Sequence, residues 1–141
     1  MNIKRLGIGV LTGLGLTTMV ATEIAIAAEQ IFVPGLVYRT GPYAPNGIPF
    51  ANGMKDYLTL INERDGGING VKIVHEECET GYNTKVGVEC YEKLKSKKPV
   101  TVIPNSTGIT YQLIPKSYKD NIPLLTMGYG RTSAAVGSVS P

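Results

Sequence analysis

The fold of this chain is decided by residues 31–73, which read IFVPGLVYRTGPYAPNGIPFANGMKDYLTLINERDGGINGVKI. The segment begins with an apolar, β-branched run that is typical of a buried strand, and a loop rich in Gly, Pro and Asn follows. Apolar residues then recur at helical spacing, and a glycine turn leads into a second strand. This order predicts a βαβ unit, in which a crossover helix joins two parallel strands. Its first loop lies where open parallel sheets bind ligands.

The first strand is expected over residues 31–38, where Pro34 marks either its true start or an edge or bulge position. The following helix is expected from Phe50 to the Asp65-Gly66-Gly67 turn, since glycine accepts the left-handed C-cap conformation. Its apolar side is predicted to carry Phe50, Met54, Tyr57 or Leu58, and Ile61. Its solvated side is predicted to carry Lys55, Asp56, Asn62, Glu63 and Arg64.

The same alternation continues along the chain. A second strand is expected over 71–74, and a second helix starts near the capping residue Asn83. A third strand over 100–103 precedes a short helix with Ile109 and Leu113 on its apolar face, and a fourth strand covers 124–126. Inward residues of the second helix are expected to be Val86, Cys90 or Tyr91, and Leu94. The order predicts an α/β fold with a doubly wound parallel sheet covered by helices on both faces.

The N-terminal residues 1–27 have the pattern of a cleaved signal peptide. A short basic start with Lys4 and Arg5 precedes an apolar run, and small residues allow cleavage after Ala27 or Ala28. The alternative is a retained membrane anchor, but the run is shorter than the roughly 20 residues that span a bilayer. We therefore expect export to the periplasm and a mature chain of residues 28–141, which is enough for one small domain.

Composition narrows the range of partners. Loss of the signal changes the formal charge from +3 to +2. Such a small positive charge argues against nucleic acid as the partner. The two cysteines, Cys78 and Cys90, favour one disulfide in an oxidising compartment, with two free buried thiols as the alternative. No CxxC spacing is present, so we expect no metal site.

The residues that could carry catalysis are few. The single histidine, His75, falls in a strand pattern without a nucleophile beside it, so a structural role is expected. Glu76, Glu77 and Glu79 form an acidic cluster, which we interpret as a solvated loop. No phosphate-binding or dinucleotide-binding loop is present, and Gly128-x-Gly130 lacks the third glycine. We expect neither an enzyme nor a cofactor.

Three strand-to-helix loops remain as a candidate ligand site, and they cover residues 40–47, 104–108 and 127–133. They are rich in Gly, hydroxyl and Tyr residues, which suit close backbone approach and anion binding at helix N-termini. Ser106 or Thr107 is expected at the cap of the third helix, and simple capping without a ligand is the alternative. Tyr43 and Tyr129 on the flanking loops favour a site, because tyrosine offers an apolar face and a polar tip.

Four segments carry a resemblance to a known family: residues 40–73, ECETGYNTKVGVEC at 77–90, PNSTGIT at 104–110 and NIPLLTMGYGRTS at 121–133. Together they resemble the first lobe of the periplasmic branched-chain-amino-acid-type substrate-binding proteins of ABC transporters. The resemblance covers essentially all of the mature chain. It implies a flavodoxin-like lobe of a type I periplasmic binding protein, with the ligand bound between two lobes and delivered to a membrane permease.

The resemblance also implies roles for individual residues. Ser106 and Thr107 match the loop that grips the ligand's carboxylate or amino group, and Tyr43 and Asn46 match the first loop of the cleft. The loop after the fourth strand matches at Tyr129, Gly130 and Arg131. A cysteine pair in the first lobe occurs in this family and agrees with a Cys78–Cys90 disulfide.

Two departures from the family bear on function. The chain ends before the first lobe is complete, so we interpret residues 28–141 as an N-terminal fragment or a truncated, non-functional copy. The GYGRT sequence after the fourth strand has a bulky tyrosine and an arginine where amino-acid binders often carry small residues, which argues against leucine-type specificity. An aromatic or otherwise different carboxylate, or an amide such as urea, stays open as the ligand. The competing hypothesis is the ligand-sensing ectodomain of a receptor, and an enzyme on the same sheet is the weakest option.

Overall fold

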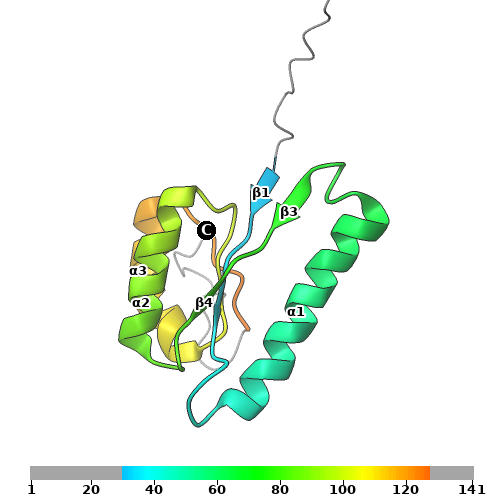
Figure 1. Ribbon diagram of the computed structural model, residues 1–141. Coiled ribbons are helices and arrows are strands. Elements are labelled where there is room, and N and C mark those ends of the chain that lie inside the picture. The colour runs from blue at the N-terminus through cyan, green and yellow to red at the C-terminus, as the bar shows by residue number, and fades with distance from the viewer. Residues whose placement is uncertain (1–29, 128–141) are drawn as a thin grey trace, which may run out of the picture.

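Residues 30–127, the part of the chain that the computed structural model describes, form a parallel sheet with helices on both faces (Figure 1). The strands are β1 (Gln30–Phe32), β2 (Gly35–Val37), β3 (Lys72–Val74), β4 (Glu77–Glu79) and β5 (Ile103–Pro104). The pairs β1–β3, β2–β4 and β2–β5 are all parallel, and Leu124 adds a parallel bridge to Val102. This topology confirms the predicted α/β parallel sheet.

Pro34 divides the predicted first strand into β1 and β2. The backbone pairing continues past it on one side, where Val33 N donates to Val74 O at 2.9 Å and Gly35 N donates to Glu76 O at 2.9 Å. On the other side Pro34 O accepts from Ile103 N at 3.0 Å, but the proline offers no N–H in return. Pro34 is therefore an interruption inside a buried strand.

Of the helices within residues 30–127, α1 (Ala44–Asp65) is the one that packs on one face of the sheet (Figure 1). It begins six residues before the predicted start at Phe50, because Pro45 in the first turn has the φ angle of a helix and needs no N–H partner there. The prediction that Phe50 faces inward is wrong, since this residue is 42% exposed. Of the two alternatives Tyr57 and Leu58, Leu58 packs against the core and Tyr57 is 61% exposed. The residues of α1 that contact the core are Ala51, Met54, Leu58 and Ile61.

Asn62 was predicted on the solvated side of α1 and lies instead against β3. Its side-chain Nδ2 donates to Ile73 O at 2.7 Å, and its Oδ1 accepts from Ile73 N at 2.8 Å. The carboxamide thus satisfies both backbone groups of Ile73 that face away from β1. The hydrophobic pattern alone gave no reason to place an asparagine there.

The other face carries α2 (Thr84–Leu94), the short 3-10 helix η1 (Lys95–Lys97) and α3 (Thr107–Asp120) (Figure 1). The predicted cap of α2 is confirmed, because Asn83 Oδ1 accepts from Val86 N at 3.1 Å. A disulfide joins Cys78 in β4 to Cys90 in α2, which also agrees with the prediction. The main core lies between these helices and the sheet and contains Leu36, Cys90, Tyr91, Leu94, Val102, Ile109, Leu113 and Ile122.

The fourth strand predicted over 124–126 is reduced to the single bridge at Leu124. Within residues 30–127, no helix has the length and apolar character needed to cross a membrane. The predicted signal peptide at 1–27 and the residues Tyr129, Gly130 and Arg131 lie outside the described part of the chain.

Candidate functional site

The loops after β2, β4 and β5 meet at the carboxyl end of the sheet, at the lower end of Figure 1. Gly41 and Gly81 show how closely the first two loops approach, because a Cβ on Gly41 would lie 3.1 Å from Gly81 O. A Cβ on Gly108 would lie 3.1 Å from Thr84 Oγ1, so α2 and α3 also begin side by side. The loop after β4 thus lies against the first candidate loop at Gly41, and the start of α2 lies against Gly108 at the start of α3.

The first loop places Tyr43 at the start of α1. Its ring is 51% exposed and packs on Tyr82, with the centroids 4.5 Å apart and the planes at 43°. Tyr82 in turn contacts the buried Tyr38 edge-on, with the centroids 4.8 Å apart. Asn46 lies in the first turn of α1, is exposed, and donates its backbone N–H to Tyr43 O at 3.0 Å. Tyr43 and Asn46 thus share one exposed turn.

The loop after β5 contains the predicted Ser106 and Thr107. Ser106 is the N-cap of α3: its Oγ accepts from Ile109 N at 3.4 Å, and the residue is 3% exposed. Thr107 is the first residue of α3 and is more accessible. The preceding Asn105 is 1% exposed, and its Oδ1 has no hydrogen-bond partner among residues 30–127. Ser106 therefore caps the start of α3, while Thr107 is the more accessible of the two residues.

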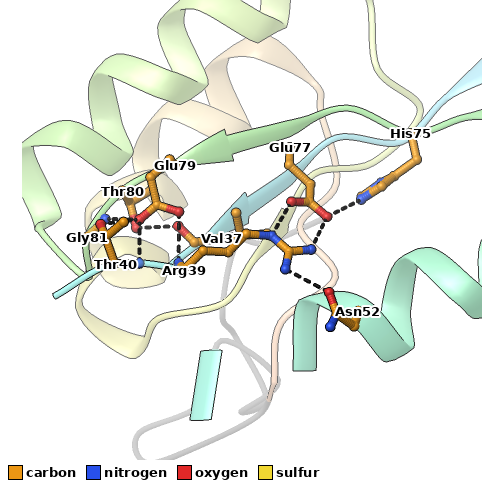
Figure 2. Close-up of polar contacts among 9 residues, drawn as sticks. All are labelled: Val37, Arg39, Thr40, Asn52, His75, Glu77, Glu79, Thr80 and Gly81. Atoms are coloured by element: carbon orange, nitrogen blue, oxygen red, sulfur yellow. Dashed lines mark hydrogen bonds and ion pairs between the residues drawn. The ribbon is translucent and has the colours of Figure 1, made fainter. Parts of the chain in front are cut away.

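An ion pair that the sequence reasoning missed connects this end of the sheet to α1 (Figure 2). Arg39 donates to both carboxylate oxygens of Glu77, through Nε at 2.6 Å and Nη2 at 2.7 Å, and its Nη1 donates to Asn52 Oδ1 at 2.7 Å. The hydrogen bonds from Arg39 hold the pKa of Glu77 below its usual value, although partial burial opposes this. The only signal of this ion pair in the sequence was Arg39, a charged residue directly after the predicted buried strand.

Glu79 connects the first loop to the loop after β4 (Figure 2). Its Oε2 accepts from Arg39 N at 2.8 Å, and its Oε1 accepts from Thr40 Oγ1 at 2.9 Å, Thr40 N at 3.3 Å and Gly81 N at 2.8 Å. Desolvation alone would raise the pKa of Glu79, but these donors outweigh it and lower the pKa. The interpretation of Glu77 and Glu79 as part of a loop is therefore wrong, because both lie in β4 and their carboxylates bind specific donors. Glu79 is nevertheless exposed, as the prediction of a solvated cluster had it.

His75 has the structural position that the sequence indicated. Its Nδ1 lies 2.7 Å from Val33 O, and its Nε2 lies 4.0 Å from Glu77 Oε1 (Figure 2). The ring lies against Gly35, because a Cβ added at Gly35 would be 3.1 Å from His75 Cε1. Within residues 30–127, no group of three His, Cys, Asp or Glu side chains could hold a metal ion.

Comparison with known families decides the identity of this fold. The profile of a family described as "Periplasmic binding protein" matches residues 30–140. The chain belongs to the periplasmic binding protein family. Membership confirms the resemblance seen in the sequence, and it implies a binding protein that works outside the cytoplasm.

Solved structures of this family share the lobe described above. A protein of the Pseudomonas fluorescens group titled an ABC transporter permease is 42% identical, with a TM-score of 0.68, over 76% of this chain and 27% of that one. An extracellular ligand-binding receptor from Verminephrobacter eiseniae is 26% identical, with a TM-score of 0.58, over 69% of this chain and 27% of that one.

A branched chain amino acid ABC transporter protein from Thermus thermophilus with bound valine is 25% identical, with a TM-score of 0.61, over 71% of this chain and 26% of that one. This chain therefore spans about a quarter of the length of these periplasmic binding proteins. A comparison with curated protein sequences found no match.

Proposed function

We propose that this chain is the N-terminal ligand-binding lobe of an exported solute-binding protein, which captures an amino acid or a related small carboxylate or amide and delivers it to the permease of an ABC transporter. Residues 1–27 serve as the signal peptide, and residues 28–141 form part of the first lobe. The proposal rests on family membership and on relatives whose titles name ABC transport.

The observation that carries the proposal is the meeting of the loops after β2, β4 and β5 at one end of the sheet. Open parallel sheets bind ligands at this end, and the helices that start there direct free N–H groups and positive dipole ends toward it. A ligand carboxylate is stabilised by these groups at the start of α3. The ligand is therefore expected next to Thr107, between the N-terminal starts of α1 and α3.

The remaining predicted residues complete the site. Ser106 fixes the first turn of α3, and Thr107 donates its hydroxyl to the ligand. Tyr43 and Asn46 line the opening from the first turn of α1. Contacts from the loop after the fourth strand come from Tyr129, Gly130 and Arg131. The second lobe, contributed by further chain, covers the ligand from the opposite side.

Native mass spectrometry tests the proposal on the protein purified from the periplasm of its producing cell. We expect a chain that starts near Ala28 and carries a small molecule, together with binding of at least one compound among L-leucine, L-phenylalanine, L-alanine and urea by calorimetry. Thr107→Val removes the hydroxyl and is expected to weaken that binding about tenfold. The matched control is Thr59→Val, because the Thr59 hydroxyl only donates to Lys55 O on the exposed side of α1.

Two outcomes would contradict the proposal. A protein that carries no small molecule and binds none of the four compounds at millimolar concentration would refute solute binding. Equal affinity of wild type and Thr107→Val would leave solute binding intact and remove Thr107 from the site.

A further inference from the structure

The loop after β4 was not part of the predicted site, yet it holds a residue in an unusual backbone conformation. Tyr82 has a φ of 63°, in the left-handed region that bulky side chains rarely adopt. The strain is offset locally: Thr80 Oγ1 accepts from Tyr82 N at 3.2 Å and itself donates to Val37 O at 2.8 Å. Such a conformation persists only where the surroundings impose it, and it often marks a functional position.

The ring of Tyr82 lies between two other tyrosines from the first loop. On its inner side is the buried ring of Tyr38, and on its outer side is the half-exposed ring of Tyr43. The strained backbone thus places the Tyr82 ring against Tyr43 at the carboxyl end of the sheet. Tyr43 and Tyr82 together form an aromatic surface, with apolar ring faces and polar hydroxyl tips, at the mouth of the proposed site.

Glu79 sets the relative position of these two rings. Its carboxylate accepts from Arg39 and Thr40 on the Tyr43 side and from Gly81 on the Tyr82 side (Figure 2). Gly41 and Gly81 touch at the same point, so the two loops are joined by contact as well as by hydrogen bonds. Loss of Oε1 would leave donors unpaired on both sides, since this oxygen accepts from Thr40 and from Gly81.

On this geometry, and given the proposed function, we propose that Tyr82 is a further ligand-contacting residue, that Glu79 is its positioning residue, and that the Tyr43–Tyr82 surface selects ligands with an apolar or planar part. A carboxylate held at the start of α3 leaves the rest of a small ligand to extend toward the neighbouring loops. The aromatic surface there favours L-phenylalanine and L-leucine over L-alanine and urea.

The test compares two variants with matched controls in the protein purified from the periplasm. Tyr82→Asn removes the ring and suits the left-handed backbone, and Tyr118→Asn makes the same change at an exposed tyrosine of α3. Glu79→Gln replaces one acceptor oxygen by a donor, and Glu89→Gln does the same at an exposed glutamate of α2. Calorimetry measures the Kd of L-phenylalanine, L-leucine, L-alanine and urea for each protein.

We expect Tyr82→Asn and Glu79→Gln to weaken binding of L-phenylalanine or L-leucine about tenfold and binding of L-alanine less than threefold, with both controls unchanged. If Glu79 had a purely structural role, Glu79→Gln would lower the unfolding midpoint and leave the ratio of the Kd for L-phenylalanine or L-leucine to the Kd for L-alanine unchanged. Near-ultraviolet circular dichroism adds a readout that needs no ligand: the packed rings of Tyr43 and Tyr82 contribute to the tyrosine band, and Glu79→Gln is expected to weaken that band.

Each contrary result points to a different error. Wild-type protein that binds L-alanine or urea but neither L-phenylalanine nor L-leucine would overturn the inferred ligand class and support the proposed function. Unchanged Kd ratios and an unchanged tyrosine band in Glu79→Gln would overturn the positioning role. Binding of none of the four compounds would refute the proposed function, and the inferred ligand contact with it.

Discussion

Two glycines of α1 offer a direct test of how this helix is packed. A Cβ added at Gly53 meets no atom within 4 Å, whereas a Cβ added at Gly47 would lie 1.9 Å from Tyr38 O and 2.3 Å from the Tyr38 ring. The substitutions Gly53→Ala and Gly47→Ala therefore make the same chemical change in the same helix. Only Gly47 lies where the start of α1 touches the end of β2.

The expected free energies of unfolding have opposite signs. Alanine is favoured over glycine inside a helix by about 1 kcal/mol, so Gly53→Ala is expected to stabilise the protein by about that amount. Gly47→Ala gains the same helix-propensity energy, but overpacking a well-packed site costs about 1–3 kcal/mol. Because the added Cβ of Gly47→Ala would clash with a backbone carbonyl, its cost is expected at or above the upper value of that range. A net loss of about 2 kcal/mol is expected for Gly47→Ala, and the two variants should differ by about 3 kcal/mol.

Urea unfolding followed by far-ultraviolet circular dichroism measures this difference. The midpoint of Gly53→Ala is expected above that of wild type and the midpoint of Gly47→Ala below it. Equal midpoints for the two variants would refute the close approach of α1 to Tyr38. Since the first turn of α1 carries Tyr43 and Asn46 at its start, Gly47→Ala is also expected to weaken ligand binding.

Three further perturbations follow from the described contacts. Replacing both Cys78 and Cys90 by alanine opens a loop with a sequence separation of 12 and is expected to lower the free energy of unfolding by about 3 kcal/mol in the chain-entropy model. A urea midpoint unchanged from that of oxidised wild type would contradict this expectation. The pKa of Glu77 is lowered in the folded state, chiefly by the hydrogen bond from Arg39, so this pair stabilises the protein above the ordinary pKa of 4.5 and the contribution is lost as the pH falls below it. Glu77→Gln should therefore flatten the loss of thermal stability in acid, and an unchanged pH profile would count against the pair. Leu113→Ala removes a fully buried side chain and is expected to lower the free energy of unfolding by about 2–5 kcal/mol, and a loss below 1 kcal/mol would mean that α3 is loosely packed.

The sequence was sufficient for features that depend on neighbouring residues. The parallel βαβ order follows from residues 31–73, and the caps at Asn83 and Ser106 follow from short polar side chains before apolar helical runs. The Cys78–Cys90 pairing needed only the count of cysteines and the expected compartment. The βαβ order and the caps depend on residues close in sequence, and each cysteine has only one other cysteine in the sequence with which to pair.

The features that were missed depend on segments distant in the chain. Phe50 has the spacing of a buried stripe with Met54 and Ile61, but the neighbouring Ala51 is the fully buried residue, and an apolar count gives alanine little weight. The Arg39–Glu77 pair joins residues 38 apart. The two residues can be paired only when β2 and β4 are known to be neighbours with Gly35 opposite Glu77.

The carboxamide of Asn62 has a consequence for how this sheet meets other molecules. A strand at the side of a sheet normally exposes unpaired N–H and C=O groups, which can recruit a strand from another chain and begin aggregation. At β3 the outward N–H and C=O of Ile73 are already taken by Asn62, as a neighbouring strand would take them. An incoming strand would have to displace this side chain and the end of α1. Among the residues that the structure describes, β3 is thereby protected at Ile73 against pairing with another strand.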